Sequence, residues 1–352
     1  MKNYVYVLIG GLILIGVIVA CVILGIQLYK SPLAPQLMIN AKTSATLPVI
    51  STTTSAASAP TAQPAATETP PAANQLSTQT PIATASTCGT GSMIVLVTGG
   101  DDSIGLPPYG ADFIRYAKVD FDQNLISVVS IPRDLWVSGP LLASKGYQGY
   151  RLGETYQLFK QTASGSHTQV MSVATTSLAQ IIYENFGLIP DHYFTVDFST
   201  YTTMIDTIGG IDVDVHNAFD ARKVGFTHYF QPGMSHFNGA LTVEYVRGFD
   251  NEWNRQQRQN EVIEAIRKKL LEPANVLRIP SLISQFSNSV TTSLSPEQIV
   301  ELTCMLKTLP SDRILFYAVG PDMVNAGQGN LLNPNTEKIR NFFRDTLGRP
   351  QN

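Results

Sequence analysis

The chain has 352 residues, enough for one large domain or two small ones. Its 24 lysine and arginine residues and 27 aspartate and glutamate residues give a formal net charge of −3. This balance excludes the basic excess that general nucleic-acid binding requires, so we expect no nucleic-acid partner. Charged residues make up only 14% of the chain and are unevenly spread, so the charge-poor segments indicate how the chain is organised.

The first segment is an apolar run without a charged residue, from Asn3 to Tyr29, flanked by Lys2 and Lys30. It exceeds the roughly 20 apolar residues that cross a bilayer. A cleaved signal peptide is the alternative, since Ile18–Cys21 resembles a bacterial lipoprotein cleavage site. Because the apolar run continues beyond this site, we predict an uncleaved, single-pass membrane anchor over residues 1–30. The short N-terminal flank favours a cytoplasmic N-terminus, with the rest of the chain outside the cell membrane.

The second segment, residues 31–90, is rich in Thr, Ser, Ala and Pro. Between Thr43 and Gly100 its only charged residue is Glu68, and it has no apolar periodicity. Such a segment cannot bury enough surface to offset the entropy lost on ordering. We therefore predict a disordered linker that spaces a folded domain from the bilayer.

The remaining chain alternates between strand and helix patterns. Short apolar or alternating runs predict the strands Met93–Thr98, Asp112–Asp120, Leu125–Ile131, Tyr193–Phe198 and Ile211–Val215. Apolar residues at helical spacing predict the helices Val170–Phe186, Thr200–Ile208, Asn238–Val246 and Asn254–Leu271, with Ser199 as the cap of the second. After Pro273, amphipathic helical patterns continue to Thr336–Leu347. This alternation favours an α/β fold, a mixed sheet sandwiched by helices.

Two carboxylates flank the turn between the first two predicted strands. Asp101 follows the first strand, and Asp112 begins the second. If the strands form an antiparallel hairpin, these carboxylates lie close together, and a hard divalent cation such as Mg²⁺ relieves their repulsion. The alternative is that Asp101 is an ordinary turn residue.

Several arginines follow predicted elements near the same end. Arg133 follows the third strand, Arg247 ends the helix Asn238–Val246, and Arg255, Arg258 and Gln259 lie in the first turns of the next helix. Guanidinium groups bind phosphate oxygens in bidentate fashion, so this set fits a pyrophosphate. A solvated charged face is the alternative for the Arg255–Gln259 run.

Other chemistries lack their motifs. The chain has no G-x-S-x-G, no Walker loop, no G-x-G-x-x-G and no histidine pair at zinc spacing. Cys88 and Cys304 both lie outside the membrane in the predicted topology. A disulfide between them and two isolated thiols are both open.

Taken in order, the motifs carry a family resemblance. They are Gly99-x-Asp101, Asp112, Ser130–Asp134 (SIPRD), Gly209–Val213 (GGIDV), Asn238-Gly239, Tyr245–Arg247 (YVR) and Arg255-x-x-Arg258-Gln259. Together they resemble the LytR–CpsA–Psr family from about residue 91 to about residue 270. The resemblance implies a catalytic-like domain over residues 91–272, with residues 273–352 as a helical extension packed on it.

The resemblance implies a Mg²⁺-dependent phosphotransferase in cell-wall assembly. Its donor would be a glycan on a polyprenyl pyrophosphate, and its acceptor would be peptidoglycan. By motif position, Asp101 and Asp112 would hold Mg²⁺ and act with Arg133 in catalysis. The pyrophosphate would be bound by Arg133, Arg151, Arg247, Arg255, Arg258 and Gln259, with Arg151 at a place where the family often has lysine. The apolar helix Val170–Phe186 is a candidate wall for the lipid tail, with a place in the core as the alternative.

Four positions depart from the family pattern. Ser103, Gly110 and Phe249 stand where family members usually carry arginine, and Glu252 stands for an aspartate. Each lost charge-assisted contact weakens pyrophosphate binding by roughly 1.5–3 kcal/mol. Two other functions therefore stay open, a non-catalytic binder or regulator of polyprenyl-pyrophosphate intermediates and a pyrophosphatase.

Overall fold

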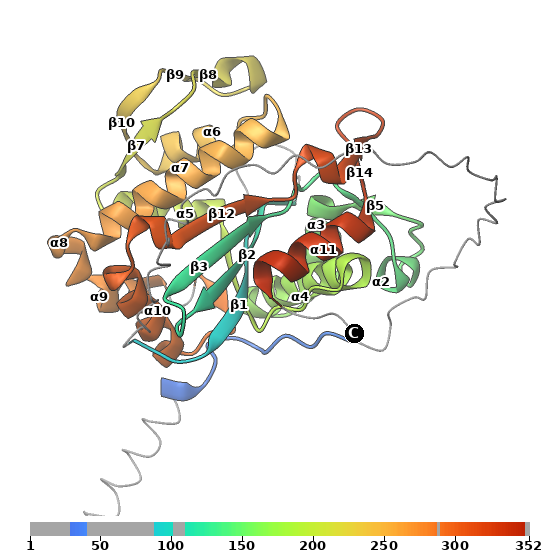
Figure 1. The fold of residues 1–352 in the computed structure, drawn as a ribbon, viewed down its shortest axis with the longest axis horizontal. Coiled ribbons are helices and arrows are strands. Elements are labelled where there is room, and N and C mark those ends of the chain that lie inside the picture. The colour runs from blue at the N-terminus through green and yellow to red at the C-terminus, as the bar shows by residue number, and fades with distance from the viewer. Residues whose placement is uncertain (1–28, 41–87, 101–109, 287–288, 349–352) are drawn as a thin grey trace, which may run out of the picture.

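The computed structural model describes residues 29–40, 88–100, 110–286 and 289–348. At its centre lies a mixed sheet of six strands (Figure 1). In order across the sheet they are β11 (Thr291–Thr292), β6 (His192–Asp197), β1 (Ser92–Gly100), β2 (Ala111–Asp120), β3 (Leu125–Ser130) and β12 (Ile314–Ala318). Strands β1, β2 and β3 form an antiparallel meander, and β6 and β12 add to its two sides in parallel. The predicted mixed α/β fold is confirmed, and the first two predicted strands pair in antiparallel fashion, which the sequence left as a condition.

Strand β1 is buried on both faces because apolar side chains point both ways from it. Ile94 and Leu96 join one hydrophobic cluster, whereas Met93 and Val95 join another. Alternate strand residues face opposite sides of a sheet, so a continuous apolar run is what a doubly covered strand requires.

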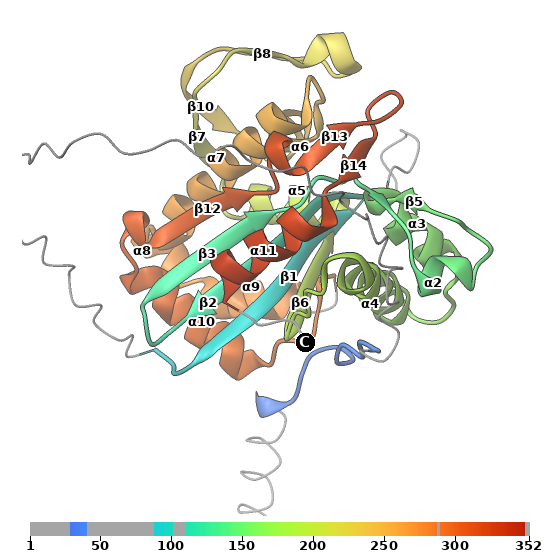
Figure 2. The same ribbon diagram turned by 45° about the vertical axis from the view of Figure 1, so that its right-hand side comes forward.

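Helices cover both faces of this sheet (Figures 1 and 2). One face carries α3 (Leu152–Thr162), α4 (His167–Phe186) and α11 (Thr336–Leu347). The other carries α5 (Phe198–Thr207), α6 (Gly239–Arg247), α7 (Glu252–Leu271), α9 (Ile279–Phe286) and α10 (Pro296–Thr308), with α8 (Pro273–Val276) between α7 and α9. Helix α5 is capped by Asp197, which accepts from Thr200 N–H at 2.6 Å, and not by Ser199, whose hydroxyl donates to Asp197.

Smaller elements complete the fold. Strand β7 (Ile211–Val215) pairs with β10 (Gly233–Phe237), and β8 (Phe219–Asp220) pairs with β9 (Tyr229–Phe230) beside the 3₁₀ turn η2 (Ala221–Val224). These lie beyond α6 and α7, at the top of Figures 1 and 2. The others are β4 (Trp136–Val137), α2 (Pro140–Ala143), β5 (Tyr150–Arg151), η3 (Ser311–Arg313), η4 (Pro321–Met323), β13 (Val324–Ala326) and β14 (Leu332–Pro334).

The C-terminal segment differs from the helical pattern that its sequence predicts. Strand β12 pairs with β3 over Ile314–Ala318 and extends the central sheet. A five-residue apolar run has too few residues to distinguish a buried strand from a helix by periodicity, and its partner lies almost 190 residues earlier. The segment is therefore part of the central sheet as well as of the helical layers.

A disulfide joins Cys88 to Cys304, with the two Cα atoms 5.5 Å apart. The structure thus selects the bonded alternative for this pair, and it ties the chain just before β1 to α10. Within the described ranges, no helix combines the length and apolarity needed to span a bilayer. Residues 1–28 of the predicted anchor, like residues 41–87 of the predicted linker, fall outside those ranges.

Residues 31–40 depart from the prediction that the linker begins at residue 31. They pack against the folded domain together with Tyr29 and Lys30, and Ala34 is 5% exposed within the core. The reason is that this stretch, unlike the Ser/Thr-rich part, carries apolar side chains at Leu33, Leu37 and Ile39.

Candidate functional site

Asp112 lies at an irregularity in the β1–β2 hairpin. Gly99 pairs with Phe113 and Gly100 pairs with Ala111, so Asp112 is an extra residue on β2. A bulge of this kind re-aims a side chain and takes its backbone out of the regular ladder. Both polar parts of Asp112, its carboxylate and its carbonyl, are consequently available to side chains from other elements.

Four of the predicted site residues converge on Asp112. Its Oδ1 accepts a hydrogen bond from Arg133 Nη1, and its Oδ2 accepts from Arg247 Nε at 3.0 Å. Its carbonyl oxygen accepts from Arg255 Nη1 at 2.8 Å and from Gln259 Nε2 at 3.4 Å. The hairpin, the end of β3, the end of α6 and the start of α7 therefore meet at one residue.

This arginine cluster is mostly buried and internally neutralised. The Arg255 and Arg247 side chains are 1% and 4% exposed. Glu252 accepts from Arg255 Nε at 3.0 Å and also from its Nη2. A buried guanidinium requires such a partner, because a charge without one is strongly destabilised in a low-dielectric interior.

Two arginines lie at the rim of the cluster. The side chains of Arg133 and Arg151 are 17% and 31% exposed, and both are close to the buried Asp134. Arg151 Nη1 donates to Asp134 Oδ1 at 3.2 Å. Burial lowers the pKa of Arg133, but the charges of Asp112 and Asp134 outweigh it and raise that pKa above its ordinary value. An anion approaching from solvent meets these two guanidinium groups first.

The structure places Arg258 apart from Asp112. It donates to the Tyr245 carbonyl at 2.9 Å, to Asp250 Oδ1 at 3.0 Å and to the Gly248 carbonyl. Its guanidinium also lies 3.8 Å from the centre of the Phe219 ring. Burial is the largest influence on Arg258 and lowers its pKa. These contacts fix the turn between α6 and α7, which carries the neighbouring arginines.

Arg115 is a participant whose side the sequence leaves open. It is 1% exposed and faces α7, where Nη1 donates to Asn260 Oδ1 at 2.6 Å and Nη2 to Gln259 Oε1 at 3.2 Å. Burial lowers the pKa of Arg115 to about 9, which leaves it charged at neutral pH. By holding Oε1 of Gln259, it turns the amide nitrogen toward Asp112. The two-residue spacing puts Arg115 on the same face of the strand as Phe113 and Ala117, but it does not say which helices cover that face.

The departures from the family pattern have distinct structural settings. Gly110 has a φ of +83°, and a Cβ there would collide with the Gly153 carbonyl, so this backbone excludes arginine at that position. Phe249 presents its ring to the guanidinium carbons of Arg133 and Arg255, at 5.8 Å and 6.0 Å from its centre. An aromatic ring attracts cations, so Phe249 links the rim to the buried part of the cluster. Ser103 and Asp101 fall outside the described residues.

The described residues contribute one carboxylate of the predicted Mg²⁺ pair. No group of three or more His, Cys, Asp or Glu side chains suited to a metal occurs in the part of the chain that the structure describes. Asp112 can still take a cation, because a carboxylate has about four lone-pair sites and the two arginines use two of them. Mg²⁺ needs only one or two protein carboxylates when phosphates and water complete its shell.

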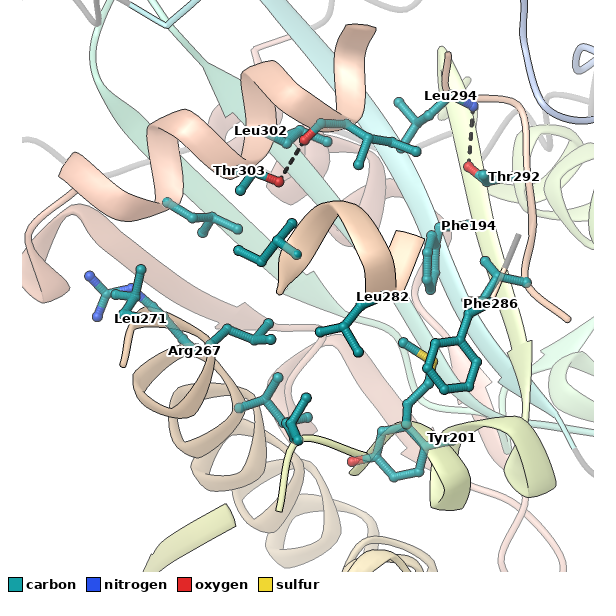
Figure 3. Close-up of a pocket in the computed structure, with 18 of the residues that line it drawn as sticks. Phe194, Tyr201, Arg267, Leu271, Leu282, Phe286, Thr292, Leu294, Leu302 and Thr303 are labelled. Atoms are coloured by element: carbon teal, nitrogen blue, oxygen red, sulfur yellow. Dashed lines mark hydrogen bonds between the residues drawn. The ribbon is translucent and has the colours of Figure 1, made fainter. Parts of the chain in front are cut away.

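A cavity of about 430 Å³ lies beside the C-terminal half of α7 (Figure 3). Its walls come from Leu33, which precedes the predicted linker segment 41–87, and from β6, α5, the C-terminal half of α7, α9, β11 and α10. Phe194, Tyr201, Leu282 and Phe286 project into it in Figure 3. The lining is almost entirely apolar, and its volume lies within the range of small-molecule sites.

Helix α4 is not among the walls of this cavity. The sequence makes it a candidate for contact with a lipid tail, but Leu178 and Ile182 are fully buried in the core on the opposite face of the sheet. Helices α9 and α10, which form part of the cavity wall, lie after Pro273 in the sequence. Their amphipathic periodicity predicts helices there but does not predict a cavity between them.

Helix α7 connects the arginine cluster to the cavity. Arg255 and Gln259 of its N-terminal half contact Asp112, whereas Ile266 and Leu270 of its C-terminal half line the cavity. Seven residues separate Gln259 from Ile266, which is about 10 Å along a helix. A ligand with an anionic head and an apolar tail matches this order.

Comparison with known proteins supports a common fold. The sequence model of the LytR_cpsA_psr family matches residues 50–345. The chain is 28% identical over 250 residues to the polyisoprenyl-teichoic acid–peptidoglycan teichoic acid transferase TagV of Bacillus subtilis, covering 67% of this chain and 60% of TagV. It is 22% identical to the cell wall biosynthesis protein LcpA of Corynebacterium glutamicum, covering 68% of this chain and 49% of LcpA. The match thus spans about half to three-fifths of these relatives.

The crystal structure of B. subtilis TagV superposes with a TM-score of 0.57 at 22% sequence identity. The superposition covers 74% of this chain and 99% of the TagV chain. The sheet and its two helical layers are thus shared with a solved protein, although identity at this level speaks for the fold alone.

Proposed function

Because the chain belongs to the LytR–CpsA–Psr family, as its motifs predict, we propose that it transfers a glycopolymer phosphate from a polyprenyl-pyrophosphate carrier to peptidoglycan. The observation that carries this proposal is the division of α7 between an arginine cluster and an apolar cavity. A polyprenyl pyrophosphate has the same division, with two phosphates at one end of a hydrocarbon chain. TagV, whose name states a related transfer, supports the choice of reaction.

The pyrophosphate would enter at the rim arginines. Arg133 and Arg151 are the two predicted binders with appreciable exposure, and an incoming phosphate would compete with Asp112 and Asp134 for them. Arg247, Arg255 and Gln259 lie directly behind and would hold the phosphate nearer the lipid. Arg258 supports this arrangement from the α6–α7 turn. Guanidinium groups in fixed positions stabilise the charge that develops on phosphate oxygens during transfer.

Mg²⁺ would be held by Asp112 together with Asp101, and it would neutralise part of the pyrophosphate charge. Release of Asp112 from Arg133 by the incoming phosphate would free lone pairs on its Oδ1 for the metal. The exchange is therefore self-consistent, since the same guanidinium serves the carboxylate before binding and the phosphate afterwards.

The lipid tail would occupy the cavity beside α7. Burial of hydrocarbon in an apolar, preformed space stabilises binding by about 25 cal/mol for each Å² removed from water. Arg267 and Lys307 are the basic residues of the lining, and Arg267 donates to the Leu309 carbonyl. The cavity would thus fix the donor so that its phosphates stay at the cluster.

The transfer would be a displacement at phosphorus. An acceptor hydroxyl of peptidoglycan attacks the phosphorus that bears the sugar, and the new P–O bond replaces the bond to the bridging oxygen. Polyprenyl phosphate leaves with that oxygen, and the hydroxyl proton is released. The rim arginines and the buried cluster balance the negative charge that shifts to the leaving group. We place this reaction at the outer face of the cell membrane, with a single-pass anchor whose N-terminus is cytoplasmic.

The test is transfer by the purified full-length protein. A synthetic lipid-pyrophosphate glycan, peptidoglycan oligomers and Mg²⁺ are combined, and the phosphodiester product is measured by mass spectrometry. Arg133→Ala should lower the rate about 10²- to 10³-fold, the effect of removing one transition-state donor. EDTA should abolish product, and Lys268→Ala, on the exposed part of α7, should leave the rate unchanged. Full activity of Arg133→Ala would contradict the proposal.

A non-catalytic binder is the second candidate. Gly110 and Phe249 favour it, because the first excludes an arginine by its backbone and the second places a ring between the remaining ones. Measurable binding of the lipid pyrophosphate without product, in the presence of Mg²⁺, would select this function. Release of polyprenyl phosphate without acceptor would instead indicate a pyrophosphatase.

A further inference from the structure

The strap, residues Tyr29–Asn40, is fastened to the domain along its length. Leu33 N–H donates to the Leu294 carbonyl at 3.2 Å, and Tyr193 Oη donates to the Pro35 carbonyl at 2.9 Å. At the far end, Asn40 N–H donates to Gln180 Oε1 at 2.8 Å. In Figures 1 and 2 the strap is the blue segment that crosses the lower end of the domain.

Packing and charge add to these hydrogen bonds. Ala34 is 5% exposed, and Leu37 and Ile39 pack against the same core cluster as α4. Lys30 lies 3.7 Å from Glu297 of α10. A segment with buried apolar side chains and satisfied backbone groups is part of the folded unit and does not behave as a free tether.

The strap brings the end of the predicted anchor to the rim of the cavity. Leu33 is one of the cavity-lining residues. The apolar run of the sequence ends at Tyr29, four residues earlier, so the two Cα atoms are no more than about 14 Å apart. Tyr29 and Leu33 are 42% and 41% exposed, and Val300 is 49% exposed on α10, the helix whose Glu297 lies near Lys30. Tyrosine and lysine side chains favour the headgroup level of a bilayer, which fits Tyr29 and Lys30 at this surface.

The Ser/Thr/Pro-rich segment has both of its ends fastened to the same domain. Asn40 precedes it and is bound to α4, and Cys88 follows it and is bonded to α10. The 47 residues from 41 to 87 therefore lie between two fixed points of one body. Their length has no influence on how far the domain lies from the anchor as long as the strap stays in place.

We propose that the strap holds the domain against a lipid bilayer, with the cavity rim at the membrane surface, so that the length of residues 41–87 does not set the distance between the domain and the membrane. The proposal rests on the membrane anchor of the proposed function. It replaces the expectation of a spacer, which would place the domain on the order of 40 Å from the anchor for 47 flexible residues. A lipid-linked donor then passes from the bilayer into the cavity without crossing water.

The test measures the distance between domain and membrane in the full chain. The protein is reconstituted in vesicles of phosphatidylethanolamine and phosphatidylglycerol that carry an acceptor dye on their headgroups. A donor fluorophore is introduced at Val300 as a noncanonical amino acid, and energy transfer is recorded. Two linkers are compared, the native one and one roughly doubled in length by a Gly/Ser insert. Each is made with the native Ala34 and with Ala34→Glu, which places a charge in the core, so that there are four proteins. Met38→Glu is the matched control, since Met38 is 84% exposed on the same strap.

With the strap docked, doubling the linker should leave energy transfer unchanged. Ala34→Glu should lower transfer severalfold and make it fall further with the longer linker, whereas Met38→Glu should behave as the native chain. If Ala34→Glu does not fold, Leu33→Glu gives the same comparison, because Leu33 is already partly exposed. The proposal would be overturned if energy transfer in the chain with native Ala34 fell as the linker was lengthened. It would also be overturned if the Ala34→Glu and Leu33→Glu variants gave the same energy transfer as the native chain. None of these readouts requires catalysis, so the fate of the transferase is decided separately by product formation.

Discussion

The two halves of helix α7 meet opposite surroundings. In the N-terminal half, Arg255, Arg258 and Gln259 are each 5% exposed or less although they are polar. In the C-terminal half, Ile266 and Leu270 are apolar and line an open cavity. Polar groups are buried where each meets a partner, and apolar groups are left uncovered where a ligand can supply the missing contact. Polarity alone therefore predicts the wrong environment for both halves.

The halves also differ in how they tolerate change. The N-terminal half depends on directional contacts with fixed partners such as Asp112 and Glu252, so one lost partner leaves a buried charge. The C-terminal half depends on apolar contact, which is non-directional and scales with area. Four predictions test this contrast.

The largest effect on stability is expected from Arg255→Met in the N-terminal half of α7. The change leaves Glu252 buried without its main cation and removes a hydrogen bond to the Asp112 carbonyl. We expect a loss of about 3–5 kcal/mol in the free energy of unfolding. Urea unfolding of the full chain in detergent measures it. Lys268→Met, on the exposed part of the same helix, should change stability by less than about 0.5 kcal/mol. Equal effects at the two positions would contradict the contrast.

The next effect concerns the Cys88–Cys304 disulfide, which ties α10 at the wall of the cavity. Its reduction should destabilise the domain by about 2–4 kcal/mol. Hydrogen exchange with and without reductant should show faster exchange in α10 and little change in the first turns of α7. Cys304→Ser should reproduce the reduced state. Exchange that rises equally around Arg255 would mean that the two regions unfold as one.

A smaller effect is expected from filling the cavity. Leu282→Trp places a larger ring in the space shown in Figure 3 and should weaken binding of a lipid pyrophosphate about tenfold, or ~1.4 kcal/mol. The free energy of unfolding should change little, because the ring enters empty space. Leu277→Trp is the control, since Leu277, directly after α8, is 83% exposed. Binding is measured by fluorescence titration, and unaltered affinity of Leu282→Trp would place the tail elsewhere.

The smallest effect is a pH dependence of stability that comes from the polar contacts around the N-terminal half of α7. Partial burial raises the pKa of Asp250, but hydrogen bonds from Asn254 and the Asn251 N–H, with the charge of Arg258, outweigh it, and the pKa is lowered. The stability that Asp250 contributes is therefore present above its ordinary pKa of about 3.9 and is lost as pH falls through the lower folded value. Because the group is partly exposed, we expect under about 1 kcal/mol. Urea unfolding at neutral pH and near pH 3 gives the change in the free energy of unfolding between the two pH values. This change should be smaller for Asp250→Asn than for the native chain. If Asp250→Asn had the same pH dependence of stability as the native chain, Asp250 would not contribute to that dependence.

Most features that depend on local contacts agree with the prediction from sequence, whereas several features that depend on distant contacts differ from it. The helix Asn254–Leu271 is predicted within two residues of α7. The helix before it is predicted from Asn238, which the structure shows to be its N-cap. The Asp197 cap of α5 is missed because Ser199 is an equally good capping type two residues later. Arg258 is predicted to bind pyrophosphate, yet its contacts are with the α6–α7 turn, because a run of arginines one turn apart does not reveal which partner each will find.

By itself, the sequence determined the α/β pattern, the strand that begins near Asp112 and the family to which the chain belongs. These features rest on periodicity and on motifs a few residues long. Only the tertiary structure decided the side on which Arg115 lies, the place of β12 in the sheet, the disulfide, the walls of the cavity and the docking of the strap. Each joins residues that are more than 100 positions apart in the chain. The physical reason is that local propensity fixes φ and ψ, whereas burial and partner choice are settled by which surfaces meet when the layers pack.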